Sequence, residues 1–374
     1  MTVEETMALS TEAILKLQSG EVLENGSKHE LPTILDVVEY LSSKENNEFL
    51  ANPNGIGIGA DWFDEGKYMW VTDKPWTNIP KLMQTSMSTF TLMRGQNDYY
   101  AQCQPSFFRK KLTDVEILIQ RLRTAEFMIL LSTHPVIYEV QSKCKVEYLA
   151  MAQHYGFPTE YIDITNNKWV AAFFASCQYD SKTEKYTPVD ENFGSGVGVV
   201  YVSEPNIQSR LFFNVQILGF QYCPRPTKQF SMVYKMSPNE NLDAHPEFKR
   251  IVFRHDKRAA QLVYEMSYQQ KRYFPFDKFA QKAQIIRGVD YELSPSSFDI
   301  CRKLKWTTLS DVEIKGILDT NGIKYHNDYR LIKAHFEQEE KAKDVKEWES
   351  YGRIKLDTSL LRTIPLCQLP NVNK

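Results

Sequence analysis

The helix and strand patterns of this sequence follow one another in an order that leaves few folds open. Residues 1–50 and the stretch after about residue 245 carry helical periodicity, whereas the segment between them mixes helices with strand-forming runs. Strands and helices do not alternate regularly, as they would in a parallel sheet. The order therefore predicts an α+β fold with a mixed or antiparallel sheet core, packed helices, and helical N- and C-terminal regions.

The same patterns divide the 374 residues into three parts. Residues 1–85 are predicted to be an N-terminal helical segment followed by a loop-rich insertion. The insertion's GIGIG run lacks the spacing of a dinucleotide-binding loop. Residues 86–240 are predicted to form the core domain, and residues 241–374 a helical region packed on that core.

Individual elements can be predicted from periodicity and capping residues. Capping boxes at Thr113/Glu116 and Ser310/Glu313 mark two helix starts, and Thr165 or Asn166 is the expected cap of a third. Further helices are expected at Pro32–Leu41, Val136–His154, Asn167–Gln178, Ala259–Gln269, Asp277–Ile286 and His326–Trp348. Strands are expected at Thr89–Met93, Tyr161–Asp163, Val197–Val202, Arg210–Leu218 and Phe230–Met236, with residues 179–196 as a polar surface loop.

The composition excludes several classes of protein. Apolar residues make up 42% and charged residues 25% of the chain, and the formal net charge is −2, so no basic excess points to nucleic acid. The apolar runs are far shorter than the roughly 20 residues of a membrane-spanning helix. Because the N-terminal residues lack a basic start and an apolar stretch, we expect a cytoplasmic protein. The six cysteines form no CxxC pair, which favours reduced thiols over a structural zinc site.

The first segment that carries chemistry is Arg94-Gly95-Gln96, at the end of a predicted strand, with Arg109 downstream. Arginine offers a planar fork of donors for a phosphate or carboxylate. Glycine lets a ligand come close to the backbone. The alternative is that Arg94 pairs with a structural carboxylate, and the spacing alone does not decide between the two.

The second segment places Gln153 and His154 on the last turn of a helix and Asp163 and Thr165 before the next helix. A histidine at a helix C-terminus can simply interact with the helix dipole. Asp163 and Thr165 can likewise serve only as helix caps. A functional reading predicts instead that Arg94, Gln153, His154, Asp163 and Thr165 converge on one cleft.

These two segments resemble the FRG domain family. The family's FRGQ-like strand end followed by Pro-Ser-x-x-Arg corresponds here to residues 93–96 and 105–109. Its QHYGxPTRxLDxT segment and FFA-type helix correspond to residues 153–165 and 173–175. The strong matches cover about residues 86–178. Three residues depart from the pattern: Met93 replaces Phe, Glu160 replaces Arg, and Ile164 replaces a frequent Trp.

The resemblance implies a bacterial or phage protein in a defence or toxin setting. The order of features is more distantly similar to ADP-ribosyltransferase-like NAD-binding folds, in which an Arg-Gly strand is followed by a Ser/Thr strand and a later Glu or Gln. Arg94 and Thr165 match the first two features, and Gln229 is preferred over Gln261 for the third. Such a site implies NAD as a substrate, with no bound cofactor or metal predicted.

This hypothesis assigns a role to each candidate residue. Catalytic roles fall to Arg94, His154, Asp163 and Gln229, and substrate binding to Gly95, Gln96, Arg109, Gln153, Tyr155 and Thr165. Tyr155 or Tyr161 would stack on nicotinamide. Because Gln229 carries no negative charge, Asp163 or Glu160 would have to supply the carboxylate that stabilises an oxocarbenium-like state.

A non-catalytic module that binds a nucleotide, a nucleic acid or a protein is the alternative function. The basic run at residues 109–111 is its local support. A deep cleft would favour small-molecule chemistry, whereas a flat basic face would favour nucleic acid. The sequence predicts no membrane contact, and it leaves the oligomeric state open.

Overall fold

The computed structural model describes residues 31–349, apart from 52–59, 64–65, 73–80, 86–90, 101, 110, 144, 182, 204–213, 219–221 and 330–331, together with 364–365. Side chains are described for residues 31–42 and 91–349 within these ranges, except at residue 143. The GIGIG run lies outside the described residues.

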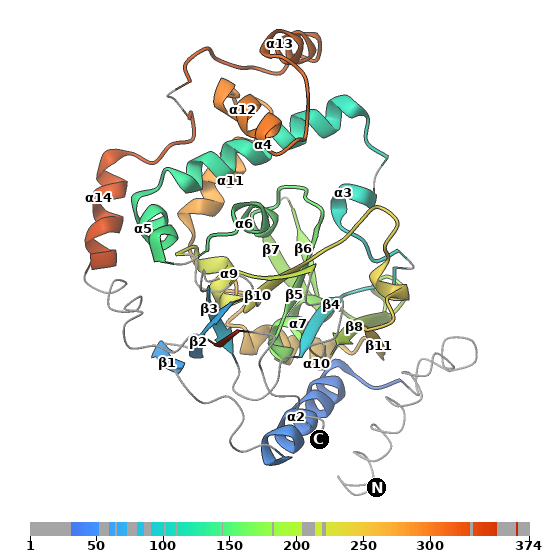
Figure 1. Ribbon diagram of the computed structural model, residues 1–374. Helices are drawn as coiled ribbons and strands as arrows, with labels where there is room; N and C mark the ends of the chain where they lie inside the picture. Colours follow the sequence, from blue (N-terminus) through green and yellow to red (C-terminus); the bar gives the residue numbers. More distant parts are fainter. Residues whose placement is uncertain are drawn as a thin grey trace, which may run out of the picture.

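A six-stranded antiparallel sheet forms the centre of the molecule (Figure 1). Its strands run in the order β11-β8-β4-β5-β10-β9. Their bounds are β4 Leu92–Gln96, β5 Tyr161–Thr165, β8 Val197–Ser203, β9 Val215–Ile217, β10 Ser231–Lys235 and β11 Lys249–Arg254. The α+β prediction is confirmed. The sheet includes β11, which lies beyond residue 240, where the sequence places the end of the core.

Two smaller sheets accompany the central one. The first contains β1 Ala60–Phe63, β2 Gly66–Thr72, β3 Lys81–Thr85 and β12 Ile364–Pro365. The second is a hairpin of β6 Cys177–Asp180 and β7 Lys185–Pro188. This hairpin corrects the expected surface loop at 179–196, because Tyr179 and Tyr186 pair directly across it and give it an aromatic face.

Helices lie on both sides of the sheet. Those shown above it in Figure 1 are α4 Asp114–Ser132, α5 Pro135–Lys143, α6 Tyr148–His154, α11 Lys278–Arg287, α12 Pro295–Lys303 and α13 Asp311–Thr320. α14 Gln338–Glu347 lies beside α5. The remaining helices are α2 Ile34–Ala51, α3 Ser106–Arg109, α7 Lys168–Ser176, α9 Pro224–Lys228, η3 Leu242–Ala244 and α10 Lys257–Met266. α7 packs against β4, and α2 and α10 pack against α7.

Local sequence explains where several helices begin. Both predicted capping boxes are present: the Thr113 hydroxyl accepts from the Glu116 N–H, and Ser310 and Glu313 form the second box. The cap of α7 is Asn167 rather than Thr165 or Asn166. Its side-chain oxygen accepts from the N–H groups of Trp169 and Val170.

Two predicted long helices are wrong. The Val136–His154 stretch forms α5 and α6, separated at residues 145–147. Buried Val146 continues the apolar periodicity across that break and so hides it. Among the described residues of His326–Trp348, only Gln338–Glu347 is an α-helix. The segment before it buries Ile332, Ala334 and Phe336 at alternate positions, which is not helical spacing.

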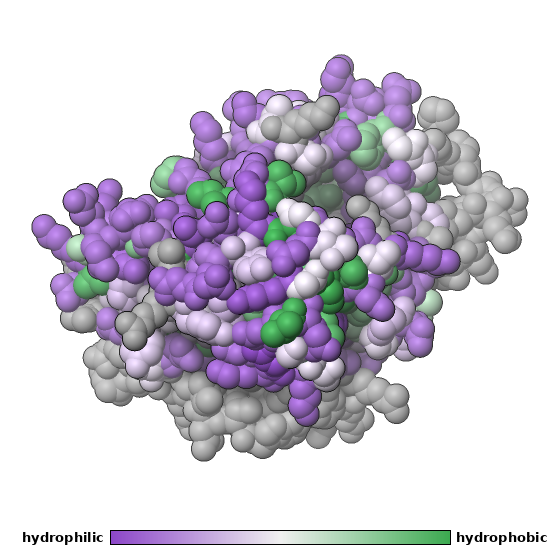
Figure 2. All heavy atoms as spheres, turned by 90° about the horizontal axis from the view of Figure 1, so that it is seen from above, coloured by the Kyte–Doolittle hydropathy of each residue, from purple (hydrophilic) through white to green (hydrophobic). Residues whose placement is uncertain are grey.

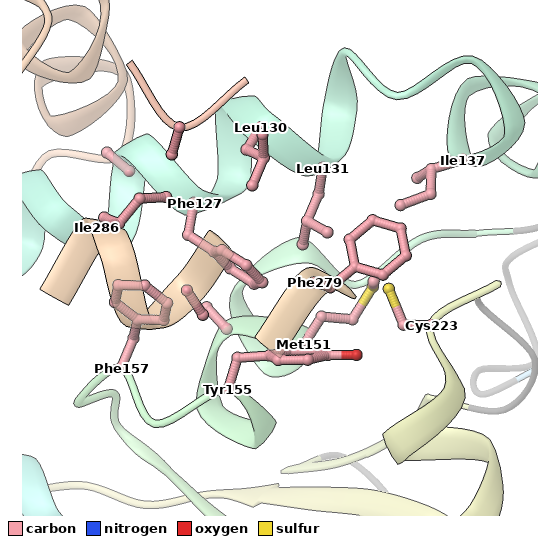
Figure 3. Close-up of a cluster of buried hydrophobic side chains, with 14 of the residues drawn as sticks. Phe127, Leu130, Leu131, Ile137, Met151, Tyr155, Phe157, Cys223, Phe279 and Ile286 are labelled. Carbon is pink, nitrogen blue, oxygen red and sulfur yellow. The ribbon is translucent and has the colours of Figure 1, made fainter. Parts of the chain in front are cut away.

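The largest hydrophobic core joins α4 to α6 and to the C-terminal helices (Figure 3). Phe127 of α4 is its centre and has no exposed surface. The Phe127 ring stacks on Phe157 with ring centroids 4.9 Å apart and contacts Tyr155 at 5.1 Å. Because Tyr155 and Phe157 flank the end of α6, this core fixes the position of that helix end.

Replacing Phe127 by alanine is expected to destabilise the protein strongly. Large-to-small substitutions of buried aromatic residues cost about 3–5 kcal/mol, because they lose transfer free energy and leave a cavity. Urea unfolding of the Phe127→Ala variant measures this loss of unfolding free energy. Tyr138→Ala is the matched control, because Tyr138 is 69% exposed on α5 and should change stability little. Equal stability of the two variants would contradict the assignment of Phe127 to the core.

The described helices and the molecular surface can be compared with what a membrane-spanning segment requires. None of the helices in the described part of the chain combines the length and apolar character of such a segment. Figure 2 shows that hydrophilic residues cover most of the upper face and that hydrophobic residues form small separate groups. Scattered apolar residues of this kind are ordinary on protein surfaces.

Candidate functional site

A cavity of about 300 Å³ opens where strands β4 and β5 part. β4 pairs with β8 over five residues but with β5 only through Met93 and Thr165. Beyond that point the Arg94 side chain bridges the two strands, with its Nη1 donating to the Asp163 carbonyl oxygen at 2.7 Å. Eight of the ten candidate residues line the cavity: Arg94, Gly95, Gln96, Arg109, His154, Asp163, Thr165 and Gln229.

Two guanidinium groups make one side of the cavity electropositive. Arg94 comes from β4 and Arg109 from α3. Partial burial of the Arg109 guanidinium and the nearby charge of Arg94 lower the pKa of Arg109, although its side chain is exposed overall. Among the described residues, neither arginine forms a salt bridge with a carboxylate. Arg94 therefore does not pair with a structural carboxylate, which was the alternative from the sequence.

Gly95 lines the cavity, but its contact with helix α7 explains why this residue is glycine. A Cβ built on Gly95 would overlap the carbonyl oxygen of Ala171 and come within 2.8 Å of the Ala175 nitrogen. The backbone of α7 therefore lies directly against β4. This close packing, rather than the approach of a ligand, is what requires glycine here.

His154 lies between two polar side chains. Its Nδ1 is 3.2 Å from the Gln229 Oε1, and its Nε2 is 3.5 Å from the Asp163 Oδ1. The His154 side chain is only 4% exposed, whereas that of Asp163 is 41% exposed at the cavity. The His154 imidazole is therefore buried between Gln229 and Asp163, and the Asp163 carboxylate lies at the cavity.

The side-chain amide and the backbone carbonyl of Gln229 take part in three hydrogen bonds. Its Nε2 donates to the carbonyl oxygen of Tyr273 at 3.2 Å, and its backbone carbonyl accepts from the Thr165 hydroxyl at 2.9 Å. The Oε1 is the atom that faces His154. Both polar groups of the amide are thus engaged by protein, so Gln229 supports His154 rather than contacting a ligand. The rival Gln261 lies exposed on α10 and bonds to Glu265.

Several polar atoms at the cavity are buried and lack a hydrogen-bond partner. Leaving such atoms unpaired costs about 1–3 kcal/mol each, so a native structure needs a reason for them. The cavity-lining residues contribute five: Arg94 Nε, Gln96 Oε1, His154 Nε2, Asp163 Oδ1 and Ser231 Oγ. Donors and acceptors gathered around one cavity are typical of a site for a polar ligand.

Gln153 and Tyr155 lie outside the cavity, which corrects their predicted binding roles. Gln153 Oε1 accepts from the Thr159 hydroxyl at 2.6 Å and so ties the turn after α6 to the helix. Tyr155 is 1% exposed, and its hydroxyl donates to the buried Asp277 at 2.7 Å. The Tyr155 ring, predicted to stack on a ligand, packs instead in the hydrophobic core of the protein.

Tyr161 and Glu160 also fall outside the cavity. Tyr161 is buried in the same core as Tyr155. Glu160 forms a salt bridge of 3.4 Å with Lys235 beside a different hollow. Asp163 is therefore the one carboxylate that lines the cavity among the described residues.

Sequence reasoning missed the aromatic wall of the cavity. Tyr179 and Tyr186 reach it from the β6–β7 hairpin, and Phe174 and Tyr100 from α7 and from the loop after β4. The alternation of Cys177 and Tyr179 with the polar residues Gln178 and Asp180 is the signal that predicts a strand there. These rings offer stacking surfaces for a flat ligand.

Comparison with known proteins agrees with the two motif segments. Residues 90–184 match the model of the FRG domain. The chain contains an FRG domain. No curated protein and no solved structure matches the chain.

The FRG domain supplies most of the cavity but not all of it. Tyr186, Gln229 and Ser231 line the cavity and lie beyond residue 184. Thus the element that holds His154 comes from outside the matched region. No group of three or more histidine, cysteine, aspartate or glutamate side chains among the described residues is arranged to hold a metal ion.

Proposed function

We propose that the FRG domain cavity binds an anionic nucleotide and that NAD is its substrate, in an ADP-ribosyltransferase- or NAD-glycohydrolase-like reaction. The observation that carries the proposal is the two-sided cavity, with Arg94 and Arg109 on one side and the His154–Asp163 pair on the other. Guanidinium groups suit phosphate, and a carboxylate suits a developing sugar cation.

The phosphate side rests on Arg94. Its Nη1 is held by the Asp163 carbonyl, while its Nε is buried without a partner. The guanidinium is therefore oriented before a ligand arrives, which reduces the entropy cost of binding. Arg109, at the end of α3, adds a second positive charge to the same cavity.

The reacting side rests on Asp163. When the bond between nicotinamide and ribose C1 breaks, nicotinamide leaves with the electron pair and the ribose becomes oxocarbenium-like. The Asp163 carboxylate would stabilise this positive charge in a partly dry site. The oxygen of water or of an acceptor then bonds to C1 and releases its proton.

The size of the cavity fits part of a dinucleotide. A volume of about 300 Å³ lies at the lower end of small-molecule sites, which hold about 300–1,000 Å³. We expect such a volume to take one nucleotide unit, with the remainder of NAD extending past the exposed Tyr179. The defence or toxin setting implied by the family resemblance is part of the same proposal, since consumption of NAD would harm a host cell.

Asp163→Asn is expected to lower nicotinamide release at saturating NAD by about 100-fold or more, as loss of one preorganised electrostatic group does. Calorimetry measures binding and chromatography measures nicotinamide. Asp256→Asn, on the α10 cap away from the cavity, is the matched control. Binding without release by the wild-type protein would leave the non-catalytic module. No binding of NAD would refute the proposal.

A further inference from the structure

We infer that Gln229 locks His154 in the tautomer that carries its proton on Nδ1, so that His154 Nε2 and Asp163 Oδ1 form a two-acceptor site for a ribose hydroxyl. The inference rests on the proposed nucleotide function and narrows its ligand to a ribonucleotide.

The Tyr273 carbonyl sets the orientation of the Gln229 amide. A carbonyl oxygen only accepts, so the amide group 3.2 Å from it is the donating Nε2. The opposite orientation would place two oxygens against each other. Tyr273 itself is 4% exposed, and the turn before it contains Tyr268, Gln269 and Gln270 with φ of 51°, 54° and 70°. Such left-handed backbone persists only where the surroundings enforce it.

The orientation of the amide determines where the proton of His154 lies. Gln229 Oε1 can only accept, so a hydrogen bond over the 3.2 Å to His154 requires a proton on Nδ1. A neutral imidazole has a single ring proton, and Nε2 is then an acceptor. Gln229 is thus a positioning residue, acting on the ligand through His154.

Two acceptors then face each other at the cavity. His154 Nε2 and Asp163 Oδ1 lie 3.5 Å apart, and both are buried without a hydrogen-bond partner. With a neutral imidazole no proton lies between them, and the arrangement is unfavourable until a donor arrives. A hydroxyl group is a neutral donor of the right size, whereas a phosphate oxygen would be repelled by Asp163.

The position of the two acceptors, His154 Nε2 and Asp163 Oδ1, next to Arg94 indicates which ligand fits. Arg94 bonds to the backbone carbonyl of Asp163, so the phosphate-binding fork and the two-acceptor site meet at one residue. A group with a phosphate near one end and a free hydroxyl near the other fits both. The ribose of a ribonucleotide has this pattern, and a 2′-deoxyribose lacks one of its hydroxyls.

The experiment compares NAD with its analogue that lacks the 2′-hydroxyl of the nicotinamide ribose. We expect the wild-type protein to bind NAD about 10- to 100-fold more tightly, since a hydrogen bond to a charged group contributes about 1.5–3 kcal/mol. Gln229→Leu should reduce this ratio to near one, because His154 can then place its proton on Nε2 and donate to Asp163.

Nitrogen-15 NMR of the histidine rings tests the lock without any ligand. The expected result is a proton on Nδ1 of His154 in the wild-type protein and its loss from Nδ1 in Gln229→Leu. Gln261→Leu, on the exposed face of α10, is the matched control and should change neither readout.

The outcomes separate the two proposals. A proton on Nε2 of wild-type His154, or equal affinity for the two dinucleotides, overturns this inference and leaves the proposed function standing. If neither dinucleotide binds, both the proposed function and the assignment of a ribonucleotide ligand are overturned. The NMR spectrum still determines whether Gln229 holds the His154 proton on Nδ1. Should Gln229→Leu not fold, the wild-type affinity ratio and the wild-type spectrum carry the test.

Discussion

Arg94→Ala is expected to lower the affinity for NAD by about 100-fold, or about 2.7 kcal/mol. A guanidinium bound to phosphate makes short, charge-assisted hydrogen bonds, and Arg94 is already oriented by its bond to the Asp163 carbonyl. The substitution also removes the link between β4 and β5 beyond Met93. Isothermal titration calorimetry gives the affinity, and a thermal shift with and without NAD gives an independent readout.

Two further variants sharpen the Arg94 experiment. Arg94→Lys keeps the charge but loses the planar fork, so its loss of affinity should fall between that of alanine and the wild type. Arg258→Ala removes an exposed arginine from α10, outside the cavity, and should leave NAD binding unchanged. An Arg94→Ala protein that binds NAD as the wild type does would sink the phosphate role of Arg94.

Gly95→Ala should be the most damaging single-methyl substitution in the described core. The added Cβ would overlap the Ala171 carbonyl oxygen, and the Ala175 nitrogen lies 2.8 Å away. Overpacking usually costs about 1–3 kcal/mol, and here the obstacle is backbone on both elements, so we expect about 3 kcal/mol or more. Denaturant unfolding measures the cost, and a large part of the protein should be insoluble on expression.

The matched control for Gly95→Ala is Gly316→Ala. Gly316 lies inside helix α13, and a Cβ built on it meets nothing within 4 Å. Alanine there should stabilise the protein by about 0.5–1 kcal/mol, because glycine is a poor helix former. If Gly95→Ala were as well tolerated as Gly316→Ala, α7 could not lie as close to β4 as described.

The contrast between Gly95 and Gly316 illustrates which features follow from neighbouring residues and which depend on tertiary packing. Short-range patterns predicted the capping boxes at Thr113 and Ser310 and a strand at Thr89–Met93 that overlaps β4, because capping and alternation involve residues a few positions apart. The same patterns failed at residues 145–147, where the apolar periodicity continues although the helix direction changes. Periodicity reports which residues are buried and does not report where the chain turns.

The motif segments brought Arg94, His154 and Asp163 to attention, and the structure places all three at one cavity. Their chemical roles remain predictions for the experiments above. Residue type alone did not separate Gln229 from Gln261, or a stacking tyrosine from a core tyrosine such as Tyr155. Those distinctions depend on which distant element each side chain meets, as Gln229 meets His154 and Tyr155 meets Asp277.

By itself the sequence determined the α+β class and the two capping boxes at Thr113 and Ser310. These follow from composition and from contacts close along the chain. Only the tertiary structure decided that β4 and β5 part beyond Met93, that α7 excludes any side chain at Gly95, and that Gln229 supports His154. A cavity forms where distant segments fail to fill space, and that failure depends on the packing of the whole sheet and its helices.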